Sequence, residues 1–206
     1  MRNEPIDPIL YLNQNFSGLE LGGGLFYRWP IGLRFDLGGR ATSPVELAGV
    51  RTRATKLFEA TFEPGHLCTV LAQDWRGEVW PHERRLFEFD QEHSVGIGMP
   101  HGKVELPCLE EPEMGPSQLK WATLESRSFK YEMILEGIAK ADHNIDSAIS
   151  SRVYFVNTIT GVMLHMYDDR GMDVLATSRT ALHVLYKNFN KWILDYDRHA
   201  IDRAFA

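Results

Sequence analysis

The sequence predicts an α+β fold, in which helices pack on a mostly antiparallel sheet within a single domain. Strand-like segments lie near both ends of the chain, and the helical segments between them do not alternate regularly with strands. The 206 residues, 44% of them hydrophobic, provide enough apolar material for one core without a disulfide. We expect residues 1–25 to form an N-terminal arm and residues 26–206 to form the domain.

The first strand and the first long helix of the domain have clear signals. Apolar and polar residues alternate over residues 31–37, which is the pattern of a half-buried strand. A helix should then begin with Ser43 as its N-cap, Pro44 at its first position and Glu46 three residues after the cap. Apolar residues recur at steps of three and four as far as Phe62, so one side of this helix is expected to face the core.

The middle of the chain is less regular. Residues 67–72 form a short apolar run that predicts a buried strand beside the first, and residues 84–89 predict another strand. Glycine and proline interrupt residues 95–117, which predicts a long irregular loop that also carries several glutamates. Such a loop is unusual in a compact domain and is interpreted either as a solvated connector or as an acidic docking loop. Residues 119–141 are expected to be helical in parts.

The last third of the chain predicts three antiparallel strands and a helix. Residues 153–157 and 162–167 are strand-like and are joined by a turn that contains a glycine, which is typical of a hairpin. A second turn leads to a third strand at residues 172–176. A single closing helix is expected to begin after Thr177 or Ser178, with one apolar stripe along its length.

The charge balance and the cysteines limit the classes of partner. With 28 acidic and 22 basic residues the net charge is −6, and no block of lysine or arginine provides the basic face that nucleic-acid binding needs. No segment approaches the ~20 apolar residues of a membrane span, and the first residues have charges and prolines where a secretory signal is apolar. Cys68 and Cys108 have no metal-ligand spacing, which fits a reducing compartment. We therefore expect a cytoplasmic protein that binds neither nucleic acid nor membrane.

The best cluster of candidate ligands is formed by His165, Asp168, Asp169 and Asp173. Three carboxylates and an imidazole within nine residues could hold a divalent cation. Successive strand residues point to opposite faces of a sheet, and aspartate also favours turns because of its own backbone hydrogen bonds. The turn is the favoured interpretation, and a metal site and a partner contact stay open as alternatives.

No other segment is typical of a catalytic site. The chain has no G-x-S-x-G motif, neither cysteine lies in an activating context, and the histidines of residues 66–101 match no zinc pattern. We therefore predict no catalytic residue, no metal and no cofactor. The aromatic residues at 26–29, Trp75 and Trp80 are interpreted as core packing, with an exposed interaction patch as the alternative, because tryptophan and tyrosine are enriched at binding hot spots.

Several motifs carry a resemblance to a known family. The most specific is Y-D-D-R-G-M-D at residues 167–173. The others are F-Y-R-W-P-I-G-L-R-F-D-L-G at residues 26–38, R-A-T-K-L-F at 53–58, R-V-Y-F-V-N at 152–157 and N-K-W-I-L-D-Y-D at 190–197. Through these motifs the chain resembles the bacterial domain-of-unknown-function family 3885 over most of residues 26–203, most strongly in its final third. The resemblance implies membership of that family and implies no reaction.

These observations lead to one leading hypothesis and two alternatives. The leading hypothesis is a non-enzymatic protein-binding module, more specifically an immunity protein that neutralises a cognate bacterial toxin, because the domain is acidic, rich in aromatic residues and lacks a catalytic set. The alternatives are a metal-dependent hydrolase that uses the His165 cluster, and a scaffolding protein. The partner is expected to be a protein, and a basic toxin or effector domain fits the charge best. The predicted partner-binding residues are Glu110, Glu111, Glu113, Asp168, Asp169, Arg170 and Asp173.

Overall fold

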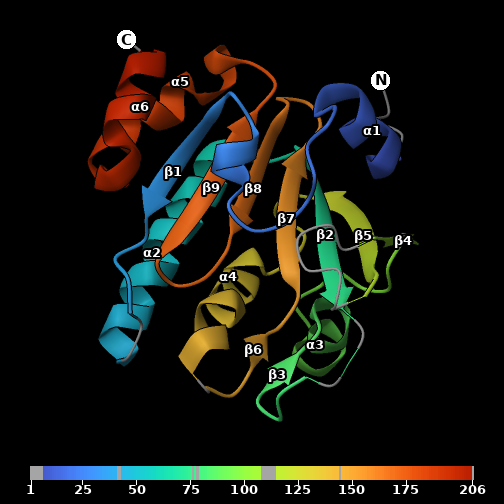
Figure 1. Ribbon diagram of the computed structural model, residues 1–206. Helices are drawn as coiled ribbons and strands as arrows, with labels where there is room; N and C mark the ends of the chain where they lie inside the picture. The colour runs from blue at the N-terminus through green and yellow to red at the C-terminus, as the bar shows by residue number, and fades with distance from the viewer. Residues whose placement is uncertain are drawn as a thin grey trace.

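The fold is built around one large antiparallel sheet. The computed structural model describes residues 7–40, 43–75, 77, 79–107, 115–143 and 145–205. The strands of the sheet are β1 (Gly32–Asp36), β2 (Leu67–Trp75), β4 (Gly102–Leu106), β5 (Ser117–Glu125), β7 (Arg152–Asn157), β8 (Val162–Met166) and β9 (Gly171–Ala176). They lie in the order β1-β9-β8-β7-β2-β5-β4, and every pair of neighbours is antiparallel (Figure 1). The predicted α+β fold in a single domain is confirmed.

Helices cover both faces of this sheet (Figure 1). One face carries α2 (Pro44–Thr61), α3 (Leu86–His93), α4 (Tyr131–Lys140), α5 (Arg179–Asn188) and α6 (Asp195–Phe205). The other face carries α1 (Pro8–Asn15) and the 3-10 helix η1 (Leu25–Arg28). Two further 3-10 helices are η3 (Ala141–His143) and η4 (Asn190–Trp192), and a small separate sheet pairs β3 (Glu83–Arg84) with β6 (Ala148–Ile149). Within the described residues, no helix has the length and apolar character of a membrane span.

Because both faces are covered, the side chains of the strands divide between two cores. Along β7, Val153 and Phe155 belong to the larger core under the long helices, whereas Tyr154 and Val156 belong to the smaller core under α1 and η1. A strand that is buried on both faces has a continuous apolar sequence, which is what residues 153–156 show.

The segment predicted as an N-terminal arm contributes to the smaller core. Asp7 is the N-cap of α1, and its carboxylate accepts hydrogen bonds from the backbone amides of Ile9 at 2.8 Å and Leu10 at 3.1 Å. Tyr11 and Phe16 are buried against the sheet. This segment is therefore a covering layer of the fold.

The prediction that the strand at residues 67–72 lies beside the first strand is wrong. The β2 strand lies between β7 and β5, and the strands β9, β8 and β7 separate it from β1. An apolar run indicates that a strand is buried, but it does not indicate which strand is its neighbour.

The predictions for the middle of the chain also need correction. The strand predicted at residues 84–89 is limited to β3, and α3 begins at Leu86. The irregular loop predicted at residues 95–117 contains β4, and the first part of the helical region predicted at residues 119–141 is strand β5. The β4 side chains alternate between half-buried and exposed because β4 is an edge strand, so its sequence lacks the apolar signal of an inner strand.

The single closing helix is interrupted. The α5 and α6 helices are separate, and the chain between them follows η4 as an extended segment. There Ile193 forms a β-bridge with Phe35 of β1, and the backbone amide of Leu194 donates a hydrogen bond of 2.9 Å to the carbonyl oxygen of Arg34. The helical spacing of apolar residues continues through this break, which is why the sequence predicts one helix.

Gly171, the first residue of β9, packs closely against its neighbours, so its substitution tests the packing around the Asp-rich turn between β8 and β9. A Cβ atom at Gly171 would collide with the side chain of Tyr167 and would lie 3.0 Å from the carbonyl oxygen of Phe35. We expect Gly171→Ala to lower the free energy of unfolding by about 1–3 kcal/mol, the usual effect of overpacking. Chemical denaturation of the purified variant measures this change.

Gly49 provides the matched control, because it lies in α2 and a Cβ atom there would meet nothing within 4 Å beyond the backbone of its own helix. Gly49→Ala should raise the free energy of unfolding by about 0.5–1 kcal/mol, since alanine is the better helix former. A Gly171→Ala protein that is as stable as the wild type would contradict the packing described for β9.

Candidate functional site

The Asp-rich turn between β8 and β9 is held by bonds within the chain. The Asp168 carboxylate accepts hydrogen bonds of 2.8 Å from both the backbone amide and the Nε of Arg170. The Asp169 carboxylate lies 2.7 Å from Nε2 of His143 in η3. Asp168 and Asp169 are buried, whereas the Arg170 side chain is 67% exposed. Of this turn, Arg170 is therefore the residue that is accessible to a partner.

The four residues considered as metal ligands are not brought together. His165 is buried in the smaller core, where its Nδ1 lies 3.0 Å from the carbonyl oxygen of Val153 and its ring packs on that of Tyr154. Asp173 lies opposite His165 in the sheet, but Asp168 and Asp169 bond elsewhere. In the part of the chain that the structure describes, no group of His, Cys, Asp and Glu side chains has the arrangement of a metal site.

Asp173 instead belongs to a buried ion pair. It lies directly opposite Arg34 in the β1–β9 pairing, and Nε of Arg34 is 3.4 Å from its carboxylate. The carboxylate is fully buried and accepts a hydrogen bond of 3.1 Å from the backbone amide of Phe26 in η1. Burial raises the pKa of Asp173 to about 6, although the amide of Phe26 and the charge of Arg34 oppose that change.

Arg34 connects Asp173 to the surface of the molecule. Its guanidinium lies 3.6 Å from the carboxylate of Asp197 at the start of α6 and donates a hydrogen bond of 3.3 Å to the hydroxyl of Tyr167. It also lies over the rings of Tyr27 and Tyr167, at 5.0 and 5.1 Å from their centroids. One largely buried cation thereby links β1, β9, η1 and α6.

Tyr27 is the outer residue of this network. Its side chain is 59% exposed, yet its hydroxyl lies 3.1 Å from each carboxylate oxygen of Asp197. Desolvation and this hydrogen bond raise the pKa of Tyr27. Tyr196, the neighbour of Asp197 in the chain, is 86% exposed. We call Tyr27 and Tyr196 the tyrosine patch.

Sequence patterns do not predict this network, for a physical reason. The alternation at residues 31–37 places Arg34 on the polar side of a half-buried strand, which predicts a solvated side chain. In the structure this side of β1 is covered by η1, so Asp173 is fully buried and the Arg34 side chain is only 16% exposed. The aromatic run at residues 26–29, for which an exposed patch is the alternative interpretation, is the available signal.

One serine lies next to a histidine, but the pair lacks the partners of a catalytic dyad. The hydroxyl of Ser147 is 3.1 Å from Nε2 of His93, and Nδ1 of His93 is 3.0 Å from the carbonyl oxygen of Phe89. The imidazole packs on the Phe89 ring at 4.1 Å, with no carboxylate bonded to it among the described residues. These bonds connect α3 to the segment before β6, and we assign them no catalytic role.

The remaining predicted partner residues, Glu110, Glu111 and Glu113, lie outside the described residues. Their predicted contact with a partner stays a prediction.

The raised pKa of Asp173 gives a pH dependence with a definite sign. Between the unfolded value of 3.8 and the folded value of about 6, the folded state retains a proton that the unfolded chain has lost, so a rise in pH weakens the folded state. We expect the free energy of unfolding of the wild type, relative to Asp173→Asn, to fall by about 2–3 kcal/mol between pH 4 and pH 7. Urea denaturation of both proteins across this range measures the difference.

His165 supplies a control of opposite sign. Burial lowers its pKa from 6.5 to about 4, so between these values the unfolded chain binds the additional proton. Relative to His165→Gln, the stability of the wild type should therefore rise with pH over the same range. For Asp173, the description of a buried carboxyl would be contradicted if the free energy of unfolding of the wild type, relative to Asp173→Asn, stayed constant or rose with pH.

Comparison with known proteins agrees with the similarity seen in the motifs. The model of the family described as Domain of unknown function (DUF3885) matches residues 9–197, which include all but the first residue of α1, the whole sheet and both tyrosines of the patch. The chain is also 21% identical to "Uncharacterized protein YnaE" of Bacillus subtilis (strain 168) over 211 residues, which cover 90% of this chain and 96% of that protein. No solved structure matches the chain. The family match covers most of the chain, and the protein belongs to the DUF3885 family.

Proposed function

We propose that the protein is a non-enzymatic protein-binding module whose partner contacts the tyrosine patch. The observation that carries the proposal is that Tyr27 is both exposed and fixed. The residue is 59% exposed, while Asp197 holds its hydroxyl and Arg34 lies over its ring.

A fixed aromatic side chain is well suited to binding. A flexible surface side chain loses rotamer freedom when a partner immobilises it, at a cost of about 0.5–1.5 kcal/mol. Tyr27 has already lost much of this freedom, because its hydroxyl and its ring are both held by charged side chains that are themselves paired. Tyrosines of this kind are enriched at the centres of protein interfaces. Tyr196, which precedes Asp197 in α6, adds a second exposed aromatic side chain.

The acidity of the chain supports a basic partner. A net charge of −6 attracts a basic protein over long distances and accelerates its association. An acidic binding module fits an immunity protein that neutralises a basic toxin in the cytoplasm of the bacterium that makes both. The glutamates 110, 111 and 113, together with the exposed Arg170, are proposed as further contacts.

Capture of the tagged protein from its native host, followed by mass spectrometry, tests this proposal first. We expect one basic protein to co-elute in near-stoichiometric amount. If that protein is a toxin, its expression should arrest growth, and co-expression of the present chain should restore growth. An eluate that holds no protein in comparable amount would contradict the binding function.

Substitutions then locate the contact on the purified pair. Tyr27→Ala and Tyr196→Ala should each weaken binding by about 30-fold, which is the effect of losing a hot-spot residue worth about 2 kcal/mol. Calorimetry or surface plasmon resonance measures the Kd.

Trp80 is the matched control, because it is 71% exposed and precedes β3, which lies at the opposite end of the molecule from α6 (Figure 1). Trp80→Ala should leave the Kd within about twofold, as expected of a residue outside the interface. An equal loss of affinity in Trp80→Ala, or no loss of affinity in the two tyrosine variants, would place the interface elsewhere.

A further inference from the structure

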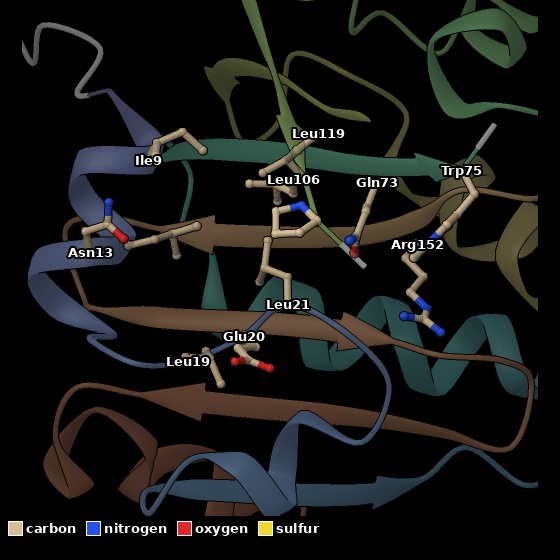
Figure 2. Close-up of a pocket in the computed structure, with 12 residues that line it drawn as sticks. Ile9, Asn13, Leu19, Glu20, Leu21, Gln73, Trp75, Leu106, Leu119 and Arg152 are labelled. Carbon is tan, nitrogen blue, oxygen red and sulfur yellow. The ribbon is translucent and has the colours of Figure 1, made fainter. Parts of the chain in front are cut away.

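A cavity of about 230 Å³ lies between α1 and the sheet, on the face that carries the smaller core (Figure 2). Its walls come from α1, residues 19–21, the end of β4, and strands β2, β5 and β7. No residue of the tyrosine patch lines it, so it is a separate feature of the molecule. Its apolar walls are formed by Ile9, Leu12, Leu19, Leu21, Leu106 and Leu119.

The size of the cavity limits the ligand that it could hold. An apolar cavity of about 150 Å³ accommodates benzene, so one of about 230 Å³ accommodates a body of about ten non-hydrogen atoms. Aliphatic walls favour a saturated chain or a small ring system.

One end of the cavity differs from the rest, because hydrogen-bond donors and a cation gather there. Trp75 lines the cavity, and its indole Nε1 is buried without a hydrogen-bond partner in the part of the chain that the structure describes. The guanidinium of Arg152 lies over the same indole, 4.6 Å from the ring centroid. Figure 2 shows Trp75, Gln73 and Arg152 on one side of the cavity and α1, with Ile9 and Asn13, on the other.

Gln73 makes this end rigid. It is 3% exposed and lies directly opposite Arg152 in the β2–β7 pairing. Its amide donates a hydrogen bond of 2.9 Å to the hydroxyl of Ser117, and its carbonyl oxygen accepts one of 2.9 Å from the hydroxyl of Tyr154. Gln73 and Trp75 lie two residues apart on the same side of β2, so this end of the cavity combines a fixed carboxamide with an unsatisfied indole N–H.

The charges set the orientation of a ligand. An indole N–H and a guanidinium both donate hydrogen bonds, so together they favour an anionic acceptor such as a carboxylate. Glu20 lies beside Leu19 and Leu21, away from Arg152 (Figure 2), and would repel an anion at that part of the cavity.

We propose that this cavity binds a monocarboxylate of about ten non-hydrogen atoms in total, with its carboxylate at Trp75 and Arg152 and its apolar body among the leucines. This site is independent of the proposed partner-binding function, and either can fail without the other.

Octanoate is the probe, used below its critical micelle concentration. In a ¹H–¹⁵N spectrum the five tryptophans give separate indole signals, and Trp75→Phe identifies the signal of Trp75. Octanoate should shift the Trp75 indole signal in a saturable way and leave that of the exposed Trp80 in place. An unmoved Trp75 signal at saturating octanoate would overturn the proposal.

The head group is tested with octanol and octylamine, which keep the chain and change its charge. Both should bind at least about tenfold more weakly than octanoate, since a charge-assisted hydrogen bond is lost. Arg152→Gln should weaken the binding of octanoate by a similar factor and leave the binding of octanol unchanged. Equal affinity for octanoate and octylamine would overturn the assignment of the anionic end.

The position of the apolar body is tested on α1 itself. Leu12 lines the cavity, whereas Leu10 lies on the same helix, is 53% exposed and does not line it. Leu12→Trp should fill the cavity and weaken octanoate binding by at least about tenfold, and Leu10→Trp should not change it. Circular dichroism shows whether each variant is folded. If Leu12→Trp does not fold, the response of the Trp75 indole signal in the ¹H–¹⁵N spectrum of the wild type decides the outcome. Unchanged binding by a folded Leu12→Trp protein would overturn the proposed site.

Discussion

Arg34 and Asp173 meet across the β1–β9 pair at a place that water hardly reaches. Burying such charges is costly, and the cost is offset when each charge finds further partners. Asp173 accepts a hydrogen bond from the backbone of η1, and Arg34 pairs with Asp197 and lies over two tyrosine rings. Several elements therefore hold their positions because they satisfy this one pair of charges. The edge strand β1, the 3-10 helix η1 and the start of α6 are all oriented by it.

The two faces of the sheet differ in how many polar side chains their strands bury. The larger core is mostly aliphatic and aromatic and is covered by helices that pack through apolar stripes, although Asn157 of β7 is buried there and donates a hydrogen bond to the carbonyl oxygen of Thr61. The smaller core contains polar side chains in neighbouring strands, among them Arg34, Asp173, His165, Tyr154 and Gln73, each with a partner. The cavity under α1 and Tyr27 of the tyrosine patch lie on the face of the sheet that carries the smaller core. Such networks specify one arrangement more strictly than apolar packing does, because each group must find its own partner.

The sequence predicts the helices and strands themselves well, but it predicts poorly which of them lie side by side. The strand at residues 31–37, the capped helix from Ser43 and the hairpin of the last third follow from periodicity, and all are present. The edge strand β4 and the break before α6 do not follow from it, because the first lacks an apolar signal and the second depends on the bridge between Ile193 and Phe35.

The candidate site is harder to predict than the fold for the same reason. Its central contacts join Phe26 to Asp173 and Tyr27 to Asp197, which are 147 and 170 residues apart in the chain. A single sequence contains no local signal for such contacts. The Asp-rich motif stands out in the sequence, yet its members serve different partners: Asp168 stabilises its own turn, Asp169 bonds to η3, and Asp173 bonds to β1 and η1.

The covering of the smaller core by the start of the chain has a consequence for biosynthesis. Residues 7–29 are synthesised before the surface on which they pack, which includes Tyr154, Met163 and Leu175. The β1 strand likewise cannot pair until β9, its neighbour in the sheet, has been synthesised. The nascent chain must therefore keep an apolar segment and an unpaired strand without their partners until β7, β8 and β9 have been synthesised. Pairing between segments so far apart in the sequence slows folding, and unpaired strands and exposed apolar surface are the features that chaperones protect.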